Sequence, residues 1–303
     1  MKVNKIVNII KPTGMTSHDV VSAVRKILNI KKVGHTGTLD PDASGVLPIC
    51  VGKSTKVSEL ILNKDKSYIC ELTLGINTDT YDSSGEILER FNVGVTEEEI
   101  KNAFETQRGE IDQIPPIYSA LKVNGKRMCD LVRSGKVDEI VVKSRRVNIK
   151  DINILSINNN KIMFYVKCSK GTYVRSICYD IGKELGCGGH MSFLLRTSSG
   201  KFNLENGITL EQLQEYKENN TLDKYLYDID YVLSNLNHVE IHQNAYKYYI
   251  NGGVIDNKRF IKQSFNYKDE LVRVYCNGYF LGTGKLSKKD NTIQLKSDKL
   301  FIV

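Results

Sequence analysis

Strand-like and helix-like patterns follow one another along the whole chain of 303 residues. Residues 3–10, 68–75 and 161–169 have the apolar and polar alternation of strands with one buried face. Residues 17–28 and 174–185 instead place their apolar side chains at helical spacing. Strands and helices are therefore mixed throughout, which predicts an α/β fold (α+β).

The composition is that of an ordinary globular protein, with 41% apolar and 26% charged residues. No uninterrupted apolar run approaches the roughly 18 residues that cross a membrane as a helix. The seven cysteines are scattered without a CxxC pair, unlike the disulfide framework of a small secreted protein. We therefore expect a cytoplasmic protein that does not bind membranes.

The positive charge is concentrated near the C-terminus. Residues 238–303 contain 11 Lys and Arg against 6 Asp and Glu, which gives +5 of the total net charge of +8. Short runs separated by Asn-Gly and Gly-Gly turns suggest that this part is a small β-barrel. We therefore predict two domains, 1–237 and 238–303, and a polyanionic partner for the second.

The segment from Gly34 to Pro48 contains three glycines and two further turn signals, and it is too apolar for a simple linker. We expect it to be irregular and to have a defined shape. Pro41 biases Asp40 toward an extended backbone, so that its carboxylate is held in a fixed pose. Such a loop can present a nucleophile, although a structural turn in which Asp40 caps a helix explains the same residues.

Three other patterns in the sequence do not predict a cofactor or metal site. Gly52-Lys53-Ser54 resembles the end of a P-loop, but Leu47 stands where that motif needs glycine. Cys187 and His190 have the spacing of half a zinc site without a second compact pair. Asp79, Asp82 and Glu86 lack the EF-hand spacing and are better interpreted as a turn near the site, in which Asp82 is a candidate for positioning neighbouring catalytic groups.

Two segments in series, KPTGMTS (residues 11–17) and GHTGTLDPDASGVLP (34–48), resemble the TruB family of tRNA pseudouridine-55 synthases. Further matches follow in the family's order: DKSY (65–68), IPPIYSALK (114–122), CSKGTYVR (168–175) and GCGGH (186–190). The resemblance implies the pseudouridine synthase fold, with a mixed, mostly antiparallel central sheet. Residues 238–303 resemble, by layout and composition, the PUA-like RNA-binding barrel that closes these enzymes.

The resemblance implies an isomerase that converts a uridine in the T loop of tRNA, position 55 in tRNA numbering, to pseudouridine. The bond between C1′ and N1 breaks, the uracil turns, and C1′ attaches to C5, with no redox change and no cofactor. A carboxylate could add to C1′, add to C6, or act as a base at C2′ to give a glycal. The residues leave these three routes open.

The resemblance also assigns roles to individual residues. Asp40 is the indispensable catalytic residue, and Arg175 pairs with it and orients it. Tyr68 stacks on the target uracil and is a candidate for removing the C5 proton, and Leu194 lines the uracil site. Tyr173 packs under the base or hydrogen-bonds the network beside Arg175. Taken singly, Tyr68 and Leu194 would be interpreted as core residues.

Contacts to the RNA are implied as well. His35 matches the histidine that fills the space left when the uridine leaves its stack. Lys11 and Lys56 match phosphate contacts, and Lys122 belongs to a basic flap over about residues 115–145. Leu195 stands where many relatives have a second arginine, so we expect no phosphate contact there.

Two rival functions remain. One is a guide-RNA-directed synthase of the related H/ACA type, which would need protein partners. The other is a non-catalytic RNA-binding or RNA-folding protein. Only ten residues precede Lys11 and the chain ends with the predicted barrel, so we expect action on the T-arm stem-loop of tRNA without an obligatory protein partner. We expect a monomer because the RNA itself supplies the large partner surface.

Overall fold

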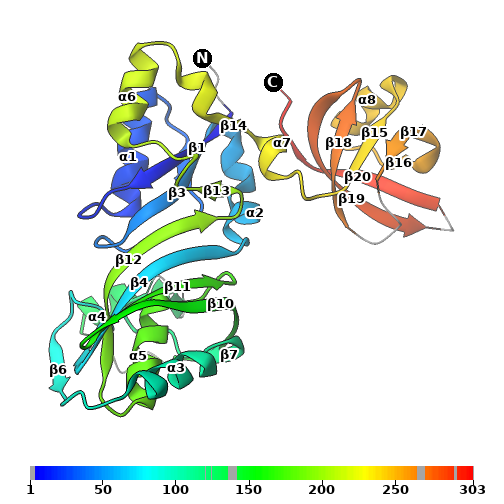
Figure 1. Cartoon of the computed structure of the whole chain (residues 1–303). Coiled ribbons are helices and arrows are strands. Elements are labelled where there is room, and N and C mark those ends of the chain that lie inside the picture. Colours follow the sequence, from blue (N-terminus) through cyan, green and yellow to red (C-terminus); the bar gives the residue numbers. More distant parts are fainter. Residues whose placement is uncertain are drawn as a thin grey trace.

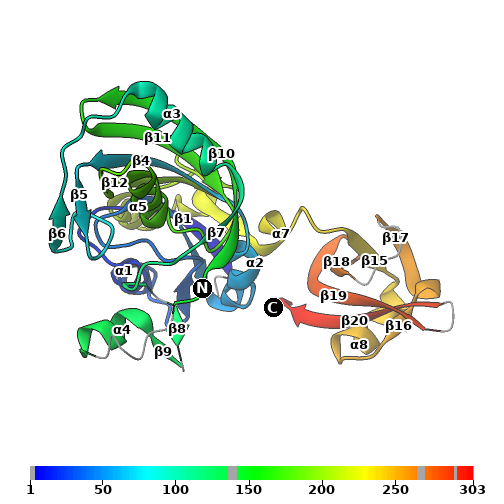
Figure 2. The ribbon, with the colours of Figure 1, turned by 90° about the horizontal axis from the view of Figure 1, so that it is seen from below.

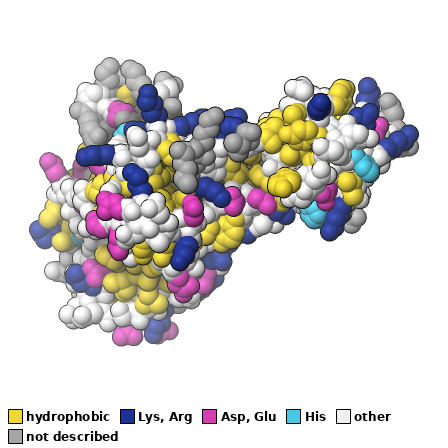
Figure 3. Space-filling model, turned by 90° about the horizontal axis from the view of Figure 1, so that it is seen from above, with side chains coloured by type: hydrophobic (Ala, Val, Ile, Leu, Met, Phe, Trp, Pro, Cys, Tyr) yellow, Lys and Arg dark blue, Asp and Glu magenta, His cyan; other side chains and the backbone are white. Residues whose placement is uncertain are grey.

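The protein is described here from a computed structural model that covers residues 4–119, 121–123, 125–135, 142–264, 270–289 and 292–302. Its strands form a large N-terminal sheet and a smaller C-terminal sheet, which lie in two bodies next to each other (Figure 1). The molecule is therefore elongated (Figure 3). Among the described helices, none has the length and apolar character needed to cross a membrane.

The large sheet has ten strands. They are β1 (Lys5–Lys11), β2 (Val33–His35), β3 (Ser44–Val51), β4 (Lys66–Leu74), β7 (Gly109–Gln113), β10 (Arg145–Asn158), β11 (Lys161–Cys168), β12 (Gly189–Ser199), β13 (Phe202–Asn203) and β14 (Leu226–Asp228). Their spatial order is β14-β1-β3-β12-β4-β11-β10-β7, with β2 beside β3 and β13 beside β12. The described pairings are antiparallel apart from the parallel contact of β12 with β3, as expected for a mixed, mostly antiparallel sheet.

Helices pack on both faces of this sheet. They are α1 (Ser17–Leu28), α2 (Ser58–Leu62), α3 (Glu97–Thr106), α4 (Met128–Arg133), α5 (Val174–Glu184), α6 (Leu210–Glu218) and α7 (Ile229–Val232). Alternate side chains of β4 and β11 are buried in a cluster with residues of α3 and α5, and Figure 2 shows α5 against the inner side of the curved sheet. Two short hairpins complete this body: β5 (Ile76–Thr78) with β6 (Ile87–Arg90), and β8 (Lys122–Val123) with β9 (Lys126–Arg127).

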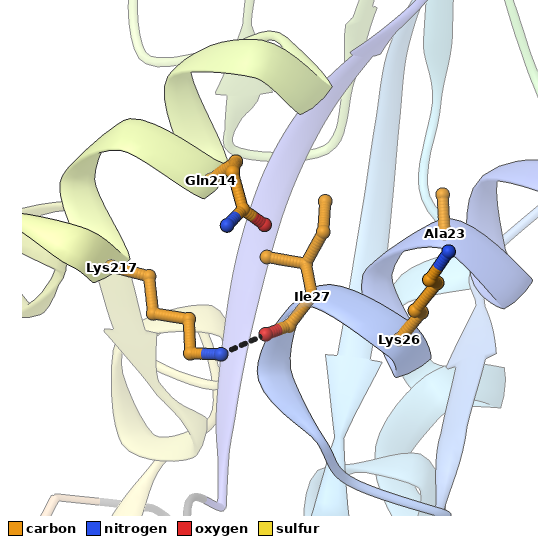
Figure 4. Close-up of a pocket in the computed structure, with 5 residues that line it drawn as sticks. All are labelled: Ala23, Lys26, Ile27, Gln214 and Lys217. Atoms are coloured by element: carbon orange, nitrogen blue, oxygen red, sulfur yellow. Dashed lines mark hydrogen bonds between the residues drawn. The ribbon is translucent and has the colours of Figure 1, made fainter.

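Helix α1 forms where its sequence predicts. Thr16 accepts a hydrogen bond from the backbone N–H of Asp19, whose carboxylate accepts one from the N–H of Thr16, so the first turn is capped on both sides. The helix packs against α6, and Lys217 of α6 donates a hydrogen bond to the carbonyl oxygen of Ile27 (Figure 4). This contact crosses a groove of about 410 Å³ between the two helices.

The expectation that residues 34–48 are irregular throughout is wrong at both ends. His35 ends β2, and residues 44–48 belong to β3, which lies inside the sheet. Pro48 has no N–H to donate, so it fits a sheet only where no partner strand needs that N–H. Its carbonyl oxygen accepts the N–H of Thr36, so its backbone polar groups face the edge of β3 that β2 and β12 share. On that edge β12 pairs with residues 44 and 45 and β2 with residues 49–51, so no ladder bond is lost at Pro48.

The C-terminal body contains a six-stranded sheet and the helix α8 (Gln243–Ile250). The strands are β15 (His238–Ile241), β16 (Ile255–Asp256), β17 (Phe260–Gln263), β18 (Leu271–Cys276), β19 (Tyr279–Lys289) and β20 (Thr292–Leu300), in the spatial order β16-β20-β19-β18-β15-β17. The sheet curls around its own apolar cluster, which includes Tyr249 of α8. This arrangement is compatible with a PUA-like domain.

The two bodies are joined by apolar packing and by polar contacts, among them the ion pair of Arg273 with Asp230 at 3.0 Å. Phe301 is 6% exposed and belongs to a cluster with Ile6 and Val57 of the N-terminal body. Lys53 donates a hydrogen bond of 2.6 Å to the carbonyl oxygen of Ile302. The last residues of the described chain are therefore anchored against the first body.

Candidate active site

Asp40 lies in the loop between β2 and β3, and two neighbouring segments fix the backbone of this loop. The Ser17 hydroxyl donates to the carbonyl oxygen of Leu39 and accepts the N–H of the same residue. The ammonium group of Lys11 donates to the carbonyl oxygen of Pro41 at 2.9 Å. Asp40 is thus placed between two residues whose backbone is held from outside the loop.

Arg175 connects the Asp40 carboxylate to a second acid. Its Nε lies 3.1 Å from Oδ2 of Asp40, and its Nη1 lies 3.3 Å from Oδ2 of Asp82. The guanidinium also donates to the carbonyl oxygens of Thr80 and Tyr118. Since the Arg175 side chain is only 7% exposed, these partners hold it in one orientation.

Asp82 is itself held by a polar turn before β6. Its Oδ1 accepts hydrogen bonds from the hydroxyl of Thr80 and from both the N–H and the hydroxyl of Ser84. Tyr81, between these groups, has a φ of 63°, a left-handed conformation that a non-glycine residue rarely adopts. Asp82 was expected to position its neighbours, and in the structure it contacts Arg175, the residue that pairs with Asp40.

The Asp40 carboxyl group is subject to two opposing effects on its pKa. Burial by surrounding protein raises this pKa above its ordinary value, and the Arg175 charge lowers it again. The Asp40 side chain nevertheless remains 40% exposed. A carboxylate that is ion-paired on one side and accessible on the other can attack a substrate atom or take a proton from it.

Tyr68 and Leu194 are buried in the apolar cluster of the first body. Each is 7% exposed, and the cluster includes Leu39, the residue before Asp40. The pKa of the Tyr68 hydroxyl is raised to about 12, chiefly by burial, and the Asp40 charge acts in the same direction. At neutral pH Tyr68 is therefore a neutral aromatic residue with a hydroxyl group beside the acid.

Tyr173 lies at the start of α5, two residues before Arg175. Its backbone N–H donates to Oε1 of Gln113, and Nε2 of Gln113 donates to its carbonyl oxygen. Burial raises the pKa of its hydroxyl, and the charges of both Arg175 and Asp40 act on it. The structure thus brings Asp40, Arg175, Tyr68 and Tyr173 into one neighbourhood, and Leu194 lies in the same apolar cluster as Tyr68.

The predicted RNA contacts have different outcomes. His35 ends β2 close to the loop, and its Nδ1 accepts the N–H of Gly37 at 3.3 Å. Burial lowers the pKa of its ring, so it is neutral at physiological pH. Lys56 is exposed at the end of the 3-10 helix 52–57. The side chain of Lys122 lies outside the described residues, as do residues 120, 124 and 136–141 of the predicted flap.

The prediction that Lys11 contacts an RNA phosphate is wrong in this structure. Its side chain has no exposed surface. Its ammonium group donates to the carbonyl oxygens of Pro12, Met15 and Pro41, which uses all three of its protons. Lys11 instead joins β1 to the Asp40 loop.

Sequence reasoning assigned no function to Arg196, although it lies in a segment that the resemblance covers. Arg196 is 1% exposed and donates to the carbonyl oxygens of Gly37, Thr38 and Val46. A buried arginine within a strand is an unusual residue, but only the structure shows that it points toward the loop.

Comparisons with known proteins establish the family to which this chain belongs. Residues 25–174 match the model of the TruB family pseudouridylate synthase (N terminal domain), and residues 175–234 match that of the tRNA pseudouridylate synthase B C-terminal domain. A curated protein named tRNA pseudouridine synthase B, from Clostridioides difficile (strain 630), is 73% identical over 300 residues, which are 99% of this chain and 100% of that protein. The chain belongs to the TruB family. A TruB relative of the same name from Alkaliphilus oremlandii (strain OhILAs) is 47% identical over 288 residues, 95% of each chain.

Solved structures extend the comparison beyond the TruB family. The crystal structure of a Cbf5-Nop10-Gar1 complex contains a chain with a TM-score of 0.77 and 30% identity, which covers 98% of this chain and 85% of that one. A chain of an H/ACA RNP bound to a substrate RNA containing 2′-deoxyuridine has a TM-score of 0.76 and 27% identity, with coverage of 99% and 85%. The similarity spans both bodies of the TruB family chain described here.

Proposed function

We propose that this chain isomerises a uridine in the T loop of tRNA, position 55 in tRNA numbering, to pseudouridine. The observation that supports this most directly is the Asp40 carboxylate, paired with Arg175 at 3.1 Å and placed beside the buried ring of Tyr68. The relative at 73% identity is a tRNA pseudouridine synthase B. The reaction class, an isomerisation by a tRNA pseudouridine synthase, follows from that identity over the full chain.

The reaction exchanges one bond of the ribose for another. The bond from C1′ to N1 breaks, the uracil turns in place, and a bond from C1′ to C5 forms. The proton on C5 is then lost, and N1 gains one. Asp40 acts as nucleophile or base in this sequence, while Arg175 keeps its carboxylate oriented and ionised.

The neighbouring side chains would hold the base during its rotation. Tyr68 offers an aromatic face for stacking and a hydroxyl group near C5, and Leu194 and Tyr173 close the apolar surroundings. His35 would occupy the space that the uridine leaves in the RNA loop. Lys56, and the flap that includes Lys122, would contact the RNA backbone.

We infer a two-part division of labour for RNA binding. Residues 1–237 would form the catalytic domain, and residues 238–303 a PUA-like RNA-binding domain, because the net charge of the second part is +5. The relatives at 73% and 47% identity are named tRNA pseudouridine synthase B, which supports action on tRNA. The chain of the Cbf5-Nop10-Gar1 complex is less similar, at 30% identity, and we propose a cytoplasmic monomer that acts without an obligatory protein partner.

The test is tritium release from a T-arm stem-loop that carries [5-³H]uridine at the target position. The purified wild-type chain should release tritium without added protein or guide RNA. Asp40→Asn should abolish release, because the amide neither attacks nor takes a proton. The matched control is Asp42→Asn, an exposed acid two residues away, which should release tritium at the wild-type rate.

Three other outcomes would count against the proposal. Release from a stem-loop that lacks the target uridine would exclude the stated specificity. Equal release by the wild type and Asp40→Asn would remove the assigned catalytic residue. Binding of both stem-loop and full-length tRNA without any release would favour guide-dependent action or a non-catalytic role in RNA folding.

A further inference from the structure

Arg196 lies beneath the loop that carries Asp40. From β12, its Nε donates to the carbonyl oxygen of Val46 at 2.6 Å. Its Nη1 and Nη2 donate to the carbonyl oxygens of Thr38 and Gly37 at 3.4 and 3.3 Å. One guanidinium therefore holds the loop on both sides of Asp40, from three residues before it to six residues after it.

The same side chain faces Tyr68. Arg196 and Tyr68 are direct cross-strand neighbours in the pairing of β12 with β4, so their side chains lie on one face of the sheet. The guanidinium approaches the Tyr68 hydroxyl, and this contact acts to lower the Tyr68 pKa against the stronger effect of burial. Arg196 thus contacts both the loop of the proposed catalytic acid and the proposed stacking residue.

The loop backbone also packs directly on Arg196. A Cβ atom built on Gly45 would lie 2.2 Å from the carbonyl oxygen of Arg196, and φ of Gly45 is +108°, so only glycine fits. Gly37 has a φ of +143°, and a Cβ atom there would lie 3.7 Å from Nη1 of Arg196. Gly45 therefore allows the close approach of the loop to Arg196, whereas at Gly37 it is the backbone conformation that favours glycine.

Stability alone is a poor explanation for this arrangement. Among the ion pairs between described residues, none includes Arg196, so its charge is buried against carbonyl oxygens and a phenol. Removing a guanidinium from water is unfavourable, and well-packed apolar residues often replace buried charges without loss of stability. The five donors of an arginine, by contrast, can hold several acceptors in one fixed geometry.

We propose that Arg196 is a positioning residue that fixes the Asp40 carboxylate relative to the Tyr68 ring during the isomerisation. The inference rests on the proposed function, because it concerns the same reaction. The uracil turns between bond breaking and bond formation, so the acid and the ring must keep their separation while the base moves. Arg196 supplies that constraint without touching the substrate.

The experiment is a single-turnover measurement with the full-length protein in excess over the [5-³H]uridine stem-loop. It compares the wild type with Arg196→Lys and Arg196→Met. Loss of positioning should lower the rate constant about 100-fold for Arg196→Met, the size expected from a small misplacement of reacting groups. Arg196→Lys keeps the charge but cannot reach three carbonyl oxygens, so its rate constant should lie between the two. The dissociation constant for RNA should not change.

The control pair is Arg108→Lys and Arg108→Met. Arg108 also donates to a backbone carbonyl oxygen, that of Ile152, but it pairs with Glu105 and Asp151 on the surface. Both Arg108 variants should keep the wild-type rate constant.

The rate constant and the amplitude separate positioning from folding. A merely structural residue would lower the fraction of active protein, and hence the amplitude, while the remaining molecules reacted at the wild-type rate. That result, or weaker RNA binding at an unchanged rate constant, would overturn the inference. If Arg196→Met does not fold, Arg196→Lys alone decides, through the same two quantities. A wild type that releases no tritium would instead refute the proposed function.

Discussion

At the scale of single residues, Asp40 is governed by the competition between burial and its partner Arg175. Burial favours the neutral carboxyl group, which cannot act as a nucleophile or base. Arg175 favours the carboxylate and is itself anchored by Asp82 and two carbonyl oxygens. The ionised state of Asp40 therefore depends on a cation that the fold holds in place.

This dependence predicts a change in the pH profile when Arg175 is replaced by methionine. The proposed mechanism requires ionised Asp40, so activity should fall as the pH falls through the pKa of this group. Arg175 lowers that pKa, so Arg175→Met should raise it and move the acidic limb of the profile to higher pH. The single-turnover rate of tritium release between pH 4.5 and 8 measures the shift.

A second variant makes this prediction specific. Arg175→Lys keeps the positive charge, so its acidic limb should stay nearer that of the wild type even if the maximum rate falls. Unshifted acidic limbs in both variants would show that Asp40 does not depend on Arg175 for its charge. Arg108→Met, on the surface, should leave the profile unchanged.

The candidate site could be predicted from sequence only where a residue type is itself informative. Asp40 and Arg175 stand out because a fixed carboxylate and a cation suit the chemistry that the resemblance implies. For Lys11 the residue type was misleading, since its ammonium group is buried among carbonyl oxygens. Arg196 lies in a strand with two register shifts, one of them just after it, so simple alternation does not reveal which face it occupies.

At the scale of elements, the helices were more predictable than the strands around the loop. The apolar spacing of residues 17–28 and the capping box at Thr16 act locally, so the sequence contains the whole signal. Strand β3 depends on distant partners, β1 on one edge and β12 or β2 on the other. Its glycine and proline residues are compatible with the sheet only because of where those partners end.

Helix α5 carries a destabilising charge that is open to test. Burial raises the pKa of Asp180 to about 6, with Lys183 acting in the opposite direction. Above that pH the folded protein holds an ionised group that would be better solvated in the unfolded chain. Asp180→Asn should therefore increase the free energy of unfolding at pH 8 by about 1–2 kcal/mol, allowing for partial solvation.

The sign of this effect is fixed by linkage. The unfolded carboxyl group titrates near pH 3.9, so the penalty in the wild type develops between about pH 4 and pH 6 and is absent below that range. Urea unfolding at pH 4 and pH 8 should show a difference between the wild type and Asp180→Asn only at pH 8. Asp223→Asn, an exposed acid, should show none at either pH, and an equal gain at both pH values would contradict the explanation.

At the scale of the whole molecule, the elongated shape places a basic C-terminal body beside a catalytic body. Phe301 and the contact of Lys53 with Ile302 fix the C-terminal end against the first body, so the two surfaces can bind one RNA at once. Lys and Arg side chains are present toward the far end of the second body (Figure 3). Such a surface should contribute to affinity through the phosphates and not to the chemical step.

The salt dependence of RNA binding tests whether the second body contributes to affinity and not to the chemical step. Lys258 and Lys262 are exposed in the second body. If both contact phosphates of full-length tRNA, replacing them with glutamine should reduce the slope of log affinity against log salt by roughly 1 to 2 and leave the rate at saturating enzyme unchanged. Filter binding between 50 and 200 mM salt (about the range in which such contacts are measurable) gives the slope.

The matched controls are Lys101→Gln and Lys161→Gln, exposed lysines of the first body that pair with Glu97 and Glu71. An unchanged slope in the Lys258 and Lys262 double variant would mean that this part of the second body does not contact the RNA backbone. A slower chemical step would mean that it also acts on the geometry around Asp40.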